Sequence, residues 1–383
     1  MTVTEINRTR RESTLNTEEM VLSMGPHHPS THGVLRLEVV TDGEVVISIK
    51  PDLGYLHRSI EKIGENVEYF QFVLYTDRVD YVCAMNSNFA YCLTVEKLGG
   101  FDVPARAEYL RVIMAELNRI SSHMICVGAL AMDMGAYTPF LYGICYREQV
   151  NDLFESVCGA RLTYNYFTIG GVAHDAPDDF VANCRGFIDY LETKMHEFNE
   201  LITGNSIFVE RLANVGIVTA AEALNWGLVG PNLRGSGVKF DLRRDEPYSI
   251  YSELDFDIPV GDGKIGTLGD CYSRYVVRVQ EVFESIKIIR QCLDRIQPGP
   301  VQGKVPKVIK LKKGEIYMRS ENPRGETGYY LVSAGGKGAD RIKIRTGSFT
   351  AMGIFDHICR GLLIGDIVAV IGSFDIVLPE VDR

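Results

Sequence analysis

The chain has 383 residues, of which 46% are hydrophobic, and a formal net charge of −10. This length and composition allow a large buried core that is divided over two or three lobes. The acidic balance and the lack of a basic block argue against nucleic acid as a partner, because phosphate backbones are bound by clustered lysine and arginine.

Nine cysteines are scattered through the sequence, and no two of them are spaced as CxxC. Dispersed cysteines in apolar sequence are typical of reduced, buried thiols in a cytosolic compartment. We therefore expect that the chain alone holds neither a zinc ion nor an iron–sulfur cluster. No glycine-rich dinucleotide fingerprint follows a predicted strand, so a bound flavin or nicotinamide is not expected either.

The first 19 residues form a polar extension of mixed charge, which predicts neither a signal peptide nor a membrane anchor. The stretch SMGPHHPSTHGVLRLEV follows soon after and places three histidines within six positions. The four-residue spacing of His28 and His32 would suit a metal on a helix, but Pro29 and the flanking glycines disfavour a helix there. From these residues alone, the imidazoles either cap carbonyls at a strand end or take part in chemistry.

Residues 34–50 contain two β-branched runs around Asp42-Gly43, which predicts a hairpin. A helix is expected to begin near Leu56. Four long amphipathic helices with short connections then predict a bundle. The first helix is expected to begin at residue 104 and to lose its pattern between residues 128 and 139. The other three are expected over residues 138–159, 177–204 and about 270–296.

These patterns predict an α+β fold, with a central bundle of long helices between strand-rich N-terminal and C-terminal lobes. The apolar segment 361–378 carries two aspartates and several glycines, so it falls short of a membrane span and is expected to form buried strand and turn. The expected divisions are the extension (1–19), the N-terminal lobe (20–103), the bundle (104–300) with an irregular, non-helical insertion near 230–265, and the C-terminal lobe (301–383).

A series of motifs runs in one order from residue 25 to the last residue: GPHHPSTHGVLR, GYLHRSIEK, TDRVDYVCAMN, RVIMAELNRISSH, MDMGAYTPF, GGV, LRGSG, NPRGETGYYLVS and DIVLPEVDR. In these motifs the chain resembles the quinone-site subunit, the D-type subunit, of proton-pumping NADH:quinone oxidoreductase (respiratory complex I). The resemblance covers essentially the whole chain after about residue 19. That family is related to the large subunit of nickel–iron hydrogenases, which implies a fold of that type.

A hydrogenase activity must be weighed against this resemblance, because hydrogenases bind nickel and iron with two CxxC pairs. At the early pair this chain has Asp80 and Cys83, and at the late pair it has Val377 and Glu380. One sulfur ligand of four cannot hold a centre that is built on soft thiolates. We therefore expect that the cavity in which a hydrogenase holds its nickel–iron centre contains no metal in this chain.

The resemblance implies that the cavity accepts a quinone headgroup, with His32 and Tyr81 as partners of its two carbonyls and Asp133 bonded to His32. Reduction by two electrons requires that both quinone oxygens take up protons. A tyrosine O–H, whose ordinary pKa is about 10, and an imidazole that exchanges protons near neutral pH are suited to this task. The other cavity positions that the resemblance implies are His28, Cys83, Asp375 and Val377.

Arg58 and Arg78 match family positions that face the terminal iron–sulfur cluster of the neighbouring B-type subunit, where positive charge would stabilise the reduced cluster. The alternative is that both arginines form ordinary surface ion pairs. Where relatives often have a histidine and an arginine near this cluster, the chain has Thr163 and Thr168. This difference predicts that the reduction potential of the cluster depends less on pH than in relatives that carry the histidine. Ile376 replaces a common proline, which leaves the placement of Val377 less restricted.

The resemblance thus implies a quinone-binding subunit in the peripheral arm of a membrane-attached NADH:quinone oxidoreductase, on the cytoplasmic face of the membrane. Quinone would be its substrate, and quinone reduction would be coupled to proton translocation. The B-, C- and I-type subunits and the membrane arm are the implied partners. Two alternatives remain, namely a scaffold subunit without catalysis and the equivalent subunit of a ferredoxin-dependent quinone oxidoreductase.

Overall fold

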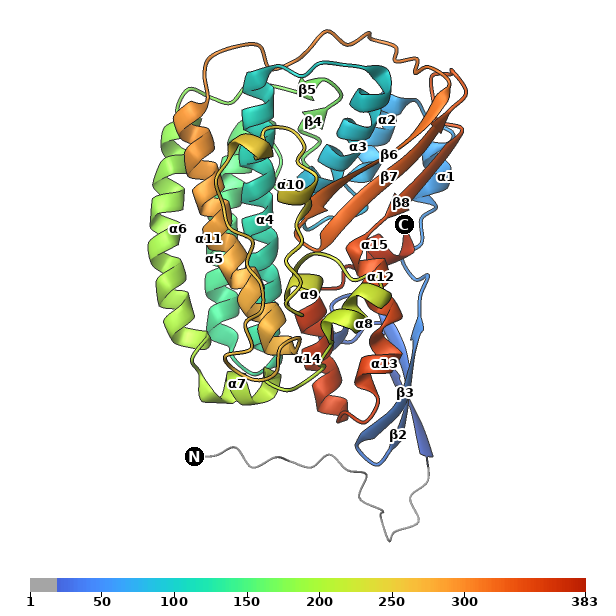
Figure 1. Cartoon of the computed structure of the whole chain (residues 1–383), viewed down its shortest axis with the longest axis vertical. Coiled ribbons are helices and arrows are strands. Elements are labelled where there is room, and N and C mark those ends of the chain that lie inside the picture. Colours follow the sequence, from blue (N-terminus) through green and yellow to red (C-terminus); the bar gives the residue numbers. More distant parts are fainter. Residues whose placement is uncertain (1–18) are drawn as a thin grey trace.

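In the computed structural model, which describes residues 19–383, a bundle of long helices stands beside two three-stranded antiparallel sheets (Figure 1). Helix α4 (Ala105–Asp133) contacts α5 (Tyr137–Cys158) and α11 (Cys271–Arg295), and α6 (Phe180–Ile202) completes the bundle. This arrangement confirms the predicted α+β fold with a central helix bundle. The predicted polar extension lies outside the described residues except for Glu19.

The two larger sheets have three antiparallel strands each. The first has the order β1 (Glu19–Met24), β2 (Arg36–Asp42) and β3 (Val45–Asp52), and the hairpin predicted at Asp42-Gly43 joins its last two strands. The second has the order β6 (Gly314–Asn322), β7 (Gly325–Ser333) and β8 (Arg341–Arg345), which confirms the short strands expected after the bundle. The strands β4 (Phe167–Thr168) and β5 (Gly171–Val172) form a small ladder of their own.

Shorter helices connect the bundle and the sheets. Between β3 and α4 lie α1 (Ile60–Gly64), α2 (Tyr69–Thr76) and α3 (Ala84–Gly99). Between α6 and α11 lie α7 (Ser206–Leu212), α8 (Ala220–Asn225), α9 (Gly230–Arg234), α10 (Leu242–Asp245) and the 3₁₀ turn η2 (Tyr251–Glu253). The insertion near 230–265, which was expected to be too irregular for helix, thus contains α9 and α10.

Several predicted helix ends were wrong by a few residues. The first helix begins at Ile60 rather than near Leu56, and α5 and α6 begin at Tyr137 and Phe180. Helix α4 ends at Asp133, within the interval of 128–139 over which the sequence loses its helical pattern. Gly128 does not end the helix; it allows α5 to approach, because a Cβ added at this glycine would lie 3.1 Å from the Cα of Phe140.

The prediction of strand and turn over 361–378 was wrong. The end of the chain forms α12 (Gly347–Gly353), α13 (Phe355–Cys359), α14 (Ile364–Phe374) and α15 (Leu378–Asp382). Helix α14 is buried over most of its length and packs on α4. The segment is rich in isoleucine, valine and glycine, which favour strand and turn, and this composition explains the error.

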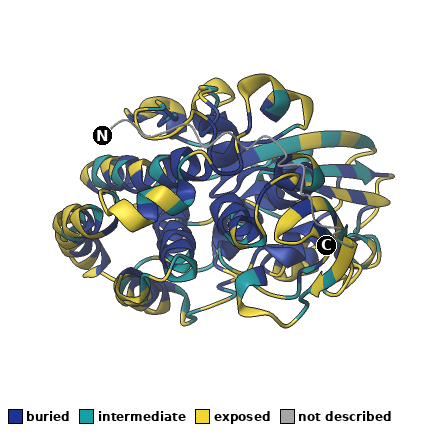
Figure 2. Ribbon diagram, turned by 90° about the horizontal axis from the view of Figure 1, so that it is seen from below, coloured by how far each residue is buried: buried dark blue, intermediate teal, exposed yellow. Residues whose placement is uncertain are grey.

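Buried residues fill the inside of the molecule, and exposed residues lie on its outward faces (Figure 2). Helices α4, α11 and α14 contact one another in this core. The core around α4 also contains charged side chains, including Glu116, Arg119 and His123, which are fully buried. Among residues 19–383, no helix combines the length and apolar character that crossing a membrane requires.

Two glycines bring α9 against the turn between β6 and β7. A Cβ added at Gly230, where φ is +61°, would lie 2.3 Å from the Cα of Gly325. Gly325 also has a positive φ of +103° and directly follows Arg324. Only glycine combines this backbone conformation with this close approach.

We expect Gly230→Ala to lower the free energy of unfolding by about 2–4 kcal/mol, because it adds backbone strain and a steric overlap. Chemical denaturation of the full chain measures the change. The control Gly186→Ala lies on the exposed face of α6 with no atom within 4 Å of the added Cβ, and it should leave stability unchanged or slightly higher. Equal stability of the two variants would contradict the prediction.

Candidate functional site

A tight turn between β1 and β2 presents His32. The 3₁₀ turn η1 (Pro29–Thr31) has His28 as its N-cap, whose Nδ1 accepts the Ser30 backbone N–H at 3.3 Å. The buried Thr31 hydroxyl donates to the His28 carbonyl at 2.7 Å. His32 follows in the left-handed conformation, with φ +51°. His28 therefore shapes the turn, and the two histidines do not share a helix face.

His32 reaches the end of α4. Its Nε2 lies 2.6 Å from Oδ2 of Asp133, the last residue of that helix, and the side chains are only 19% and 7% exposed. The pair also lies beside α14, because a Cβ added at Gly372 would be 3.3 Å from Asp133 Oδ2 and 3.7 Å from His32 Cε1. Three segments that are distant in sequence thus enclose one hydrogen-bonded His–Asp pair.

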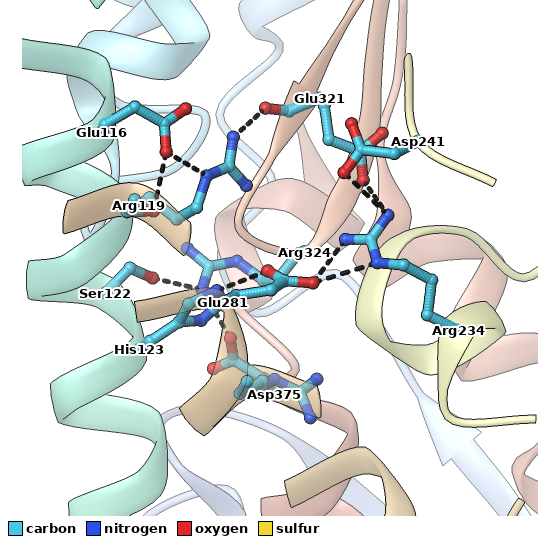
Figure 3. Close-up of polar contacts among 12 residues, drawn as sticks. Glu116, Arg119, Ser122, His123, Arg234, Asp241, Glu281, Glu321, Arg324 and Asp375 are labelled. Carbon is cyan, nitrogen blue, oxygen red and sulfur yellow. Dashed lines mark hydrogen bonds and ion pairs between the residues drawn. The ribbon is translucent and has the colours of Figure 1, made fainter. Parts of the chain in front are cut away.

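A second polar cluster centres on Arg324, which is fully buried in the turn between β6 and β7 (Figure 3). Its Nη1 donates to Asp375 at 2.8 Å and to the Ser122 hydroxyl of α4 at 3.0 Å. Its Nε donates to Asp80 at 3.1 Å and lies 3.4 Å from Glu380 of α15. We call Arg324, Asp80, Asp375 and Glu380 the Arg324 cluster.

Of the four positions that the resemblance to hydrogenases assigns to cysteines, three lie around this guanidinium. Asp80 and Glu380 pair with it, and Cys83 Sγ lies 3.6 Å from its Nη2. Cys83 is fully buried and donates to Asp80, whereas the Val377 backbone N–H donates to Ser348. Among residues 19–383, no group of three or more His, Cys, Asp or Glu side chains is arranged to hold a metal ion.

One guanidinium faces three carboxyl groups here, and their protonation states differ. Burial and the Asp80 charge raise the pKa of Glu380 to about 8, although Arg324 opposes this rise. Burial would raise the pKa of Asp375 as well, but Arg324 brings it below its ordinary value. Glu380 has one oxygen near Ser348 and Arg324, and its other oxygen, Oε1, has no hydrogen-bond partner. The raised pKa and the unpartnered oxygen both favour the protonated form of Glu380.

Tyr81 directly follows Asp80 and is 40% exposed. Partial burial and the neighbouring Asp80 charge raise the pKa of Tyr81, so its O–H stays protonated. Within the described part of the chain, no hydrogen bond joins Tyr81 to His32. Asp375 also contributes to the raised pKa of Tyr81. It follows Gly372, which packs beside His32, by three residues.

The two predicted cluster-facing arginines lie together at the surface. Arg58 donates to the Arg78 backbone carbonyl at 3.0 Å, and both side chains are exposed. The segment before Arg58 is anchored by α15, because Asp382 accepts the backbone N–H groups of Gly54 at 2.9 Å and Leu56 at 2.8 Å.

Thr163 and Thr168, the two threonines that were expected to lie near the cluster, have different surroundings. Thr163 is half-buried in the loop that follows α5. This loop contacts the C-terminal end of α2, because the Asn165 backbone N–H donates to Asp77 at 3.2 Å. Asp77 directly precedes Arg78, so this loop lies near the exposed arginines. Thr168 is buried in β4, and its carbonyl accepts from Arg111 at 2.6 Å.

A network of buried charges adjoins the Arg324 cluster along α4 and was not expected from the sequence (Figure 3). Glu281 accepts from Arg234 at 2.6 Å and pairs with His123 at 2.8 Å. Arg119 donates to the Glu321 carbonyl at 2.6 Å. The signal lay in the motifs NRISSH, LRGSG and NPRGET, which contain Arg119, His123, Arg234 and Arg324.

Comparisons with known proteins agree with one another. The family described as the 49 kDa subunit of respiratory-chain NADH dehydrogenase matches residues 133–312 and 305–383. The second D-type subunit of the NADH-quinone oxidoreductase of Sorangium cellulosum is 55% identical over 369 residues, which cover 96% of this chain and 95% of the relative. The D-type subunit of the NADH-quinone oxidoreductase of Chlorobaculum tepidum is 53% identical over 376 residues, which cover 97% of this chain and 94% of the relative.

The neutral state of Glu380 has a measurable effect on stability. Its pKa of about 8 in the folded chain exceeds the ordinary value of 4.5, so folding favours the protonated form. The resulting contribution to stability is full below pH 4.5 and is lost as the pH rises towards 8, by at most about 1.4 kcal/mol per pH unit. Glu380→Gln removes this loss. We therefore expect the variant to gain stability relative to the natural chain between about pH 5 and 8.

Denaturation of the full chain at a series of pH values measures this difference. The control is Glu200→Gln on an exposed face of α6, for which the difference from the natural chain should not change with pH. A stability difference for Glu380→Gln that is constant between about pH 5 and 8 would show that Glu380 is charged throughout this range.

Proposed function

The chain belongs to the family of the 49 kDa, D-type subunit of NADH-quinone oxidoreductase, and from this membership we propose that it forms part of a quinone-reducing cavity. In this cavity a quinone would take electrons from an iron–sulfur cluster of a neighbouring subunit and be protonated to quinol. The observation that carries the proposal is the His32–Asp133 pair, which three distant segments enclose at one end of α14.

The proposed reaction adds two electrons and two protons to the quinone. Asp133 occupies Nε2 of His32, which leaves Nδ1 to bond one quinone oxygen. The carboxylate orients the ring and balances the charge of the imidazolium that delivers the proton. Tyr81 would donate its O–H to the other oxygen, and the raised pKa of Tyr81 keeps this proton in place until the quinone becomes negative.

The remaining parts of the proposal concern the partners. Arg58 and Arg78 would face the cluster that the B-type subunit holds, and their exposure supports this position. The C- and I-type subunits and the membrane arm would complete the complex on the cytoplasmic face of the membrane, where quinone reduction is coupled to proton translocation. The chain itself would hold no flavin, nicotinamide or iron–sulfur cluster.

Two alternatives differ in their chemistry. A scaffold subunit needs no oriented imidazole, so the enclosed His32–Asp133 pair favours a catalytic role. A ferredoxin-dependent complex would use the same cavity, because the electron-input module belongs to other subunits. The genes that neighbour this one distinguish that alternative.

We expect Tyr81→Phe to lower the quinone reductase turnover of the assembled complex at least about tenfold, because a positioned general acid contributes roughly 10²–10⁴ in rate. The variant keeps the ring and loses only the hydroxyl. The control Tyr190→Phe removes an exposed hydroxyl on α6 and should leave turnover unchanged. Near-normal turnover of Tyr81→Phe would favour the scaffold alternative or another proton donor.

We also expect the reduction potential of the cluster facing Arg78 to change with pH by much less than ~59 mV per pH unit, the slope for one proton per electron. Thr163 offers no imidazole that could take up a proton on reduction. Potentiometric titration of the complex between about pH 6 and 8 measures the slope. Thr163→His should steepen it, and a slope near ~59 mV in the natural complex would refute the prediction.

A further inference from the structure

The His32–Asp133 pair closes at a place where α14 has no side chain. A Cβ added at Gly372 would lie 2.9 Å from Leu130 Cδ1 and 3.3 Å from Asp133 Oδ2, and 3.7 Å from His32 Cε1. The backbone of Gly372 is helical, so its conformation does not demand glycine. A side chain here would have to displace the flexible end of Leu130 and push the Asp133 carboxylate by a few tenths of an ångström, whereas 3.7 Å from His32 is an ordinary van der Waals contact.

The end of α14 cannot retreat to make this space. Arg278 donates to the Ser373 carbonyl at 2.6 Å, and Arg274 donates to the Ser373 hydroxyl at 3.1 Å. Asn232 donates to the Phe374 carbonyl at 3.1 Å. All three of these donors are buried. An added methyl group must therefore be accommodated on the side of α4 and η1.

We propose that Gly372 is a positioning residue of the quinone site, whose missing side chain lets His32 and Asp133 approach within hydrogen-bonding distance. This inference rests on the proposed function of the pair and deepens it. Gly372 does not touch the substrate in this account. It fixes the distance between α14 and the pair, and through that distance the direction in which the imidazole points.

Gly372→Ala in the assembled complex tests this role. We expect turnover to fall at least about tenfold, because small displacements of a catalytic group are costly. The matched control is Gly365→Ala, on the same helix but exposed, where the added Cβ would meet only the flexible end of Arg211 at 3.4 Å. Both variants gain the same helix propensity, and only Gly372→Ala should lose activity.

A double-mutant cycle separates positioning from general damage. In the Asp133→Asn background the pair is already weakened, so adding Gly372→Ala should change turnover less than about twofold. Independent, multiplying effects of the two substitutions would overturn the inference. If Asp133→Asn alone leaves turnover normal, the proposed function of the pair fails.

A structural readout keeps the inference testable in that case too. The structure of the complex that carries Gly372→Ala should show His32 Nε2 and Asp133 Oδ2 further apart than the 2.6 Å of the natural chain. If the separation stays at 2.6 Å, Gly372 is not a positioning residue.

Discussion

The guanidinium of Arg324 joins four segments that are far apart in the sequence. It bonds the loop before α3 through Asp80, helix α4 through Ser122 and the end of α14 through Asp375, and it lies within 3.4 Å of Glu380 on α15. Losing one partner of a buried ion pair typically costs about 3–5 kcal/mol, because a charge is left without compensation. The loop that carries Tyr81 and the helix end beside His32 are therefore held by one cation.

The position of this cation gives a physical account of how a hydrogenase-like chamber can change its chemistry. Soft thiolates at Asp80, Val377 and Glu380 would favour a metal at this place. Carboxyl groups at two of these positions bring in a guanidinium instead, and the neutral Glu380 limits the excess of negative charge. The positive centre at this place is thus supplied by the chain.

Local patterns in the sequence predicted the elements whose burial is one-sided. The hairpin at Asp42-Gly43 and the amphipathic helices of the bundle were recognised from turn chemistry and from three- and four-residue periodicity. Helix α14 was missed because its isoleucines, valines and glycines favour strand and turn. The motif NPRGET contains Arg324, but no local pattern shows that Arg324 or Glu380 is buried, since a buried charge is recognisable only by partners that the fold brings together. The pairing of His32 with Asp133, 101 residues apart, was predicted through resemblance and not through physics.

The bonds from Asp382 to the backbone of Gly54 and Leu56 set a limit on the order in which the chain can fold during synthesis, because Asp382 follows Gly54 by 328 residues. Strand β3 has a similar dependence, because the Val46 N–H donates to the Leu362 carbonyl at 2.9 Å. None of these bonds can form before the ribosome has made and released the residue at the distant end of the bond, Asp382 or Leu362. The surface around Arg58 is therefore completed late, and a growing chain cannot present it to other subunits when its N-terminal lobe first emerges.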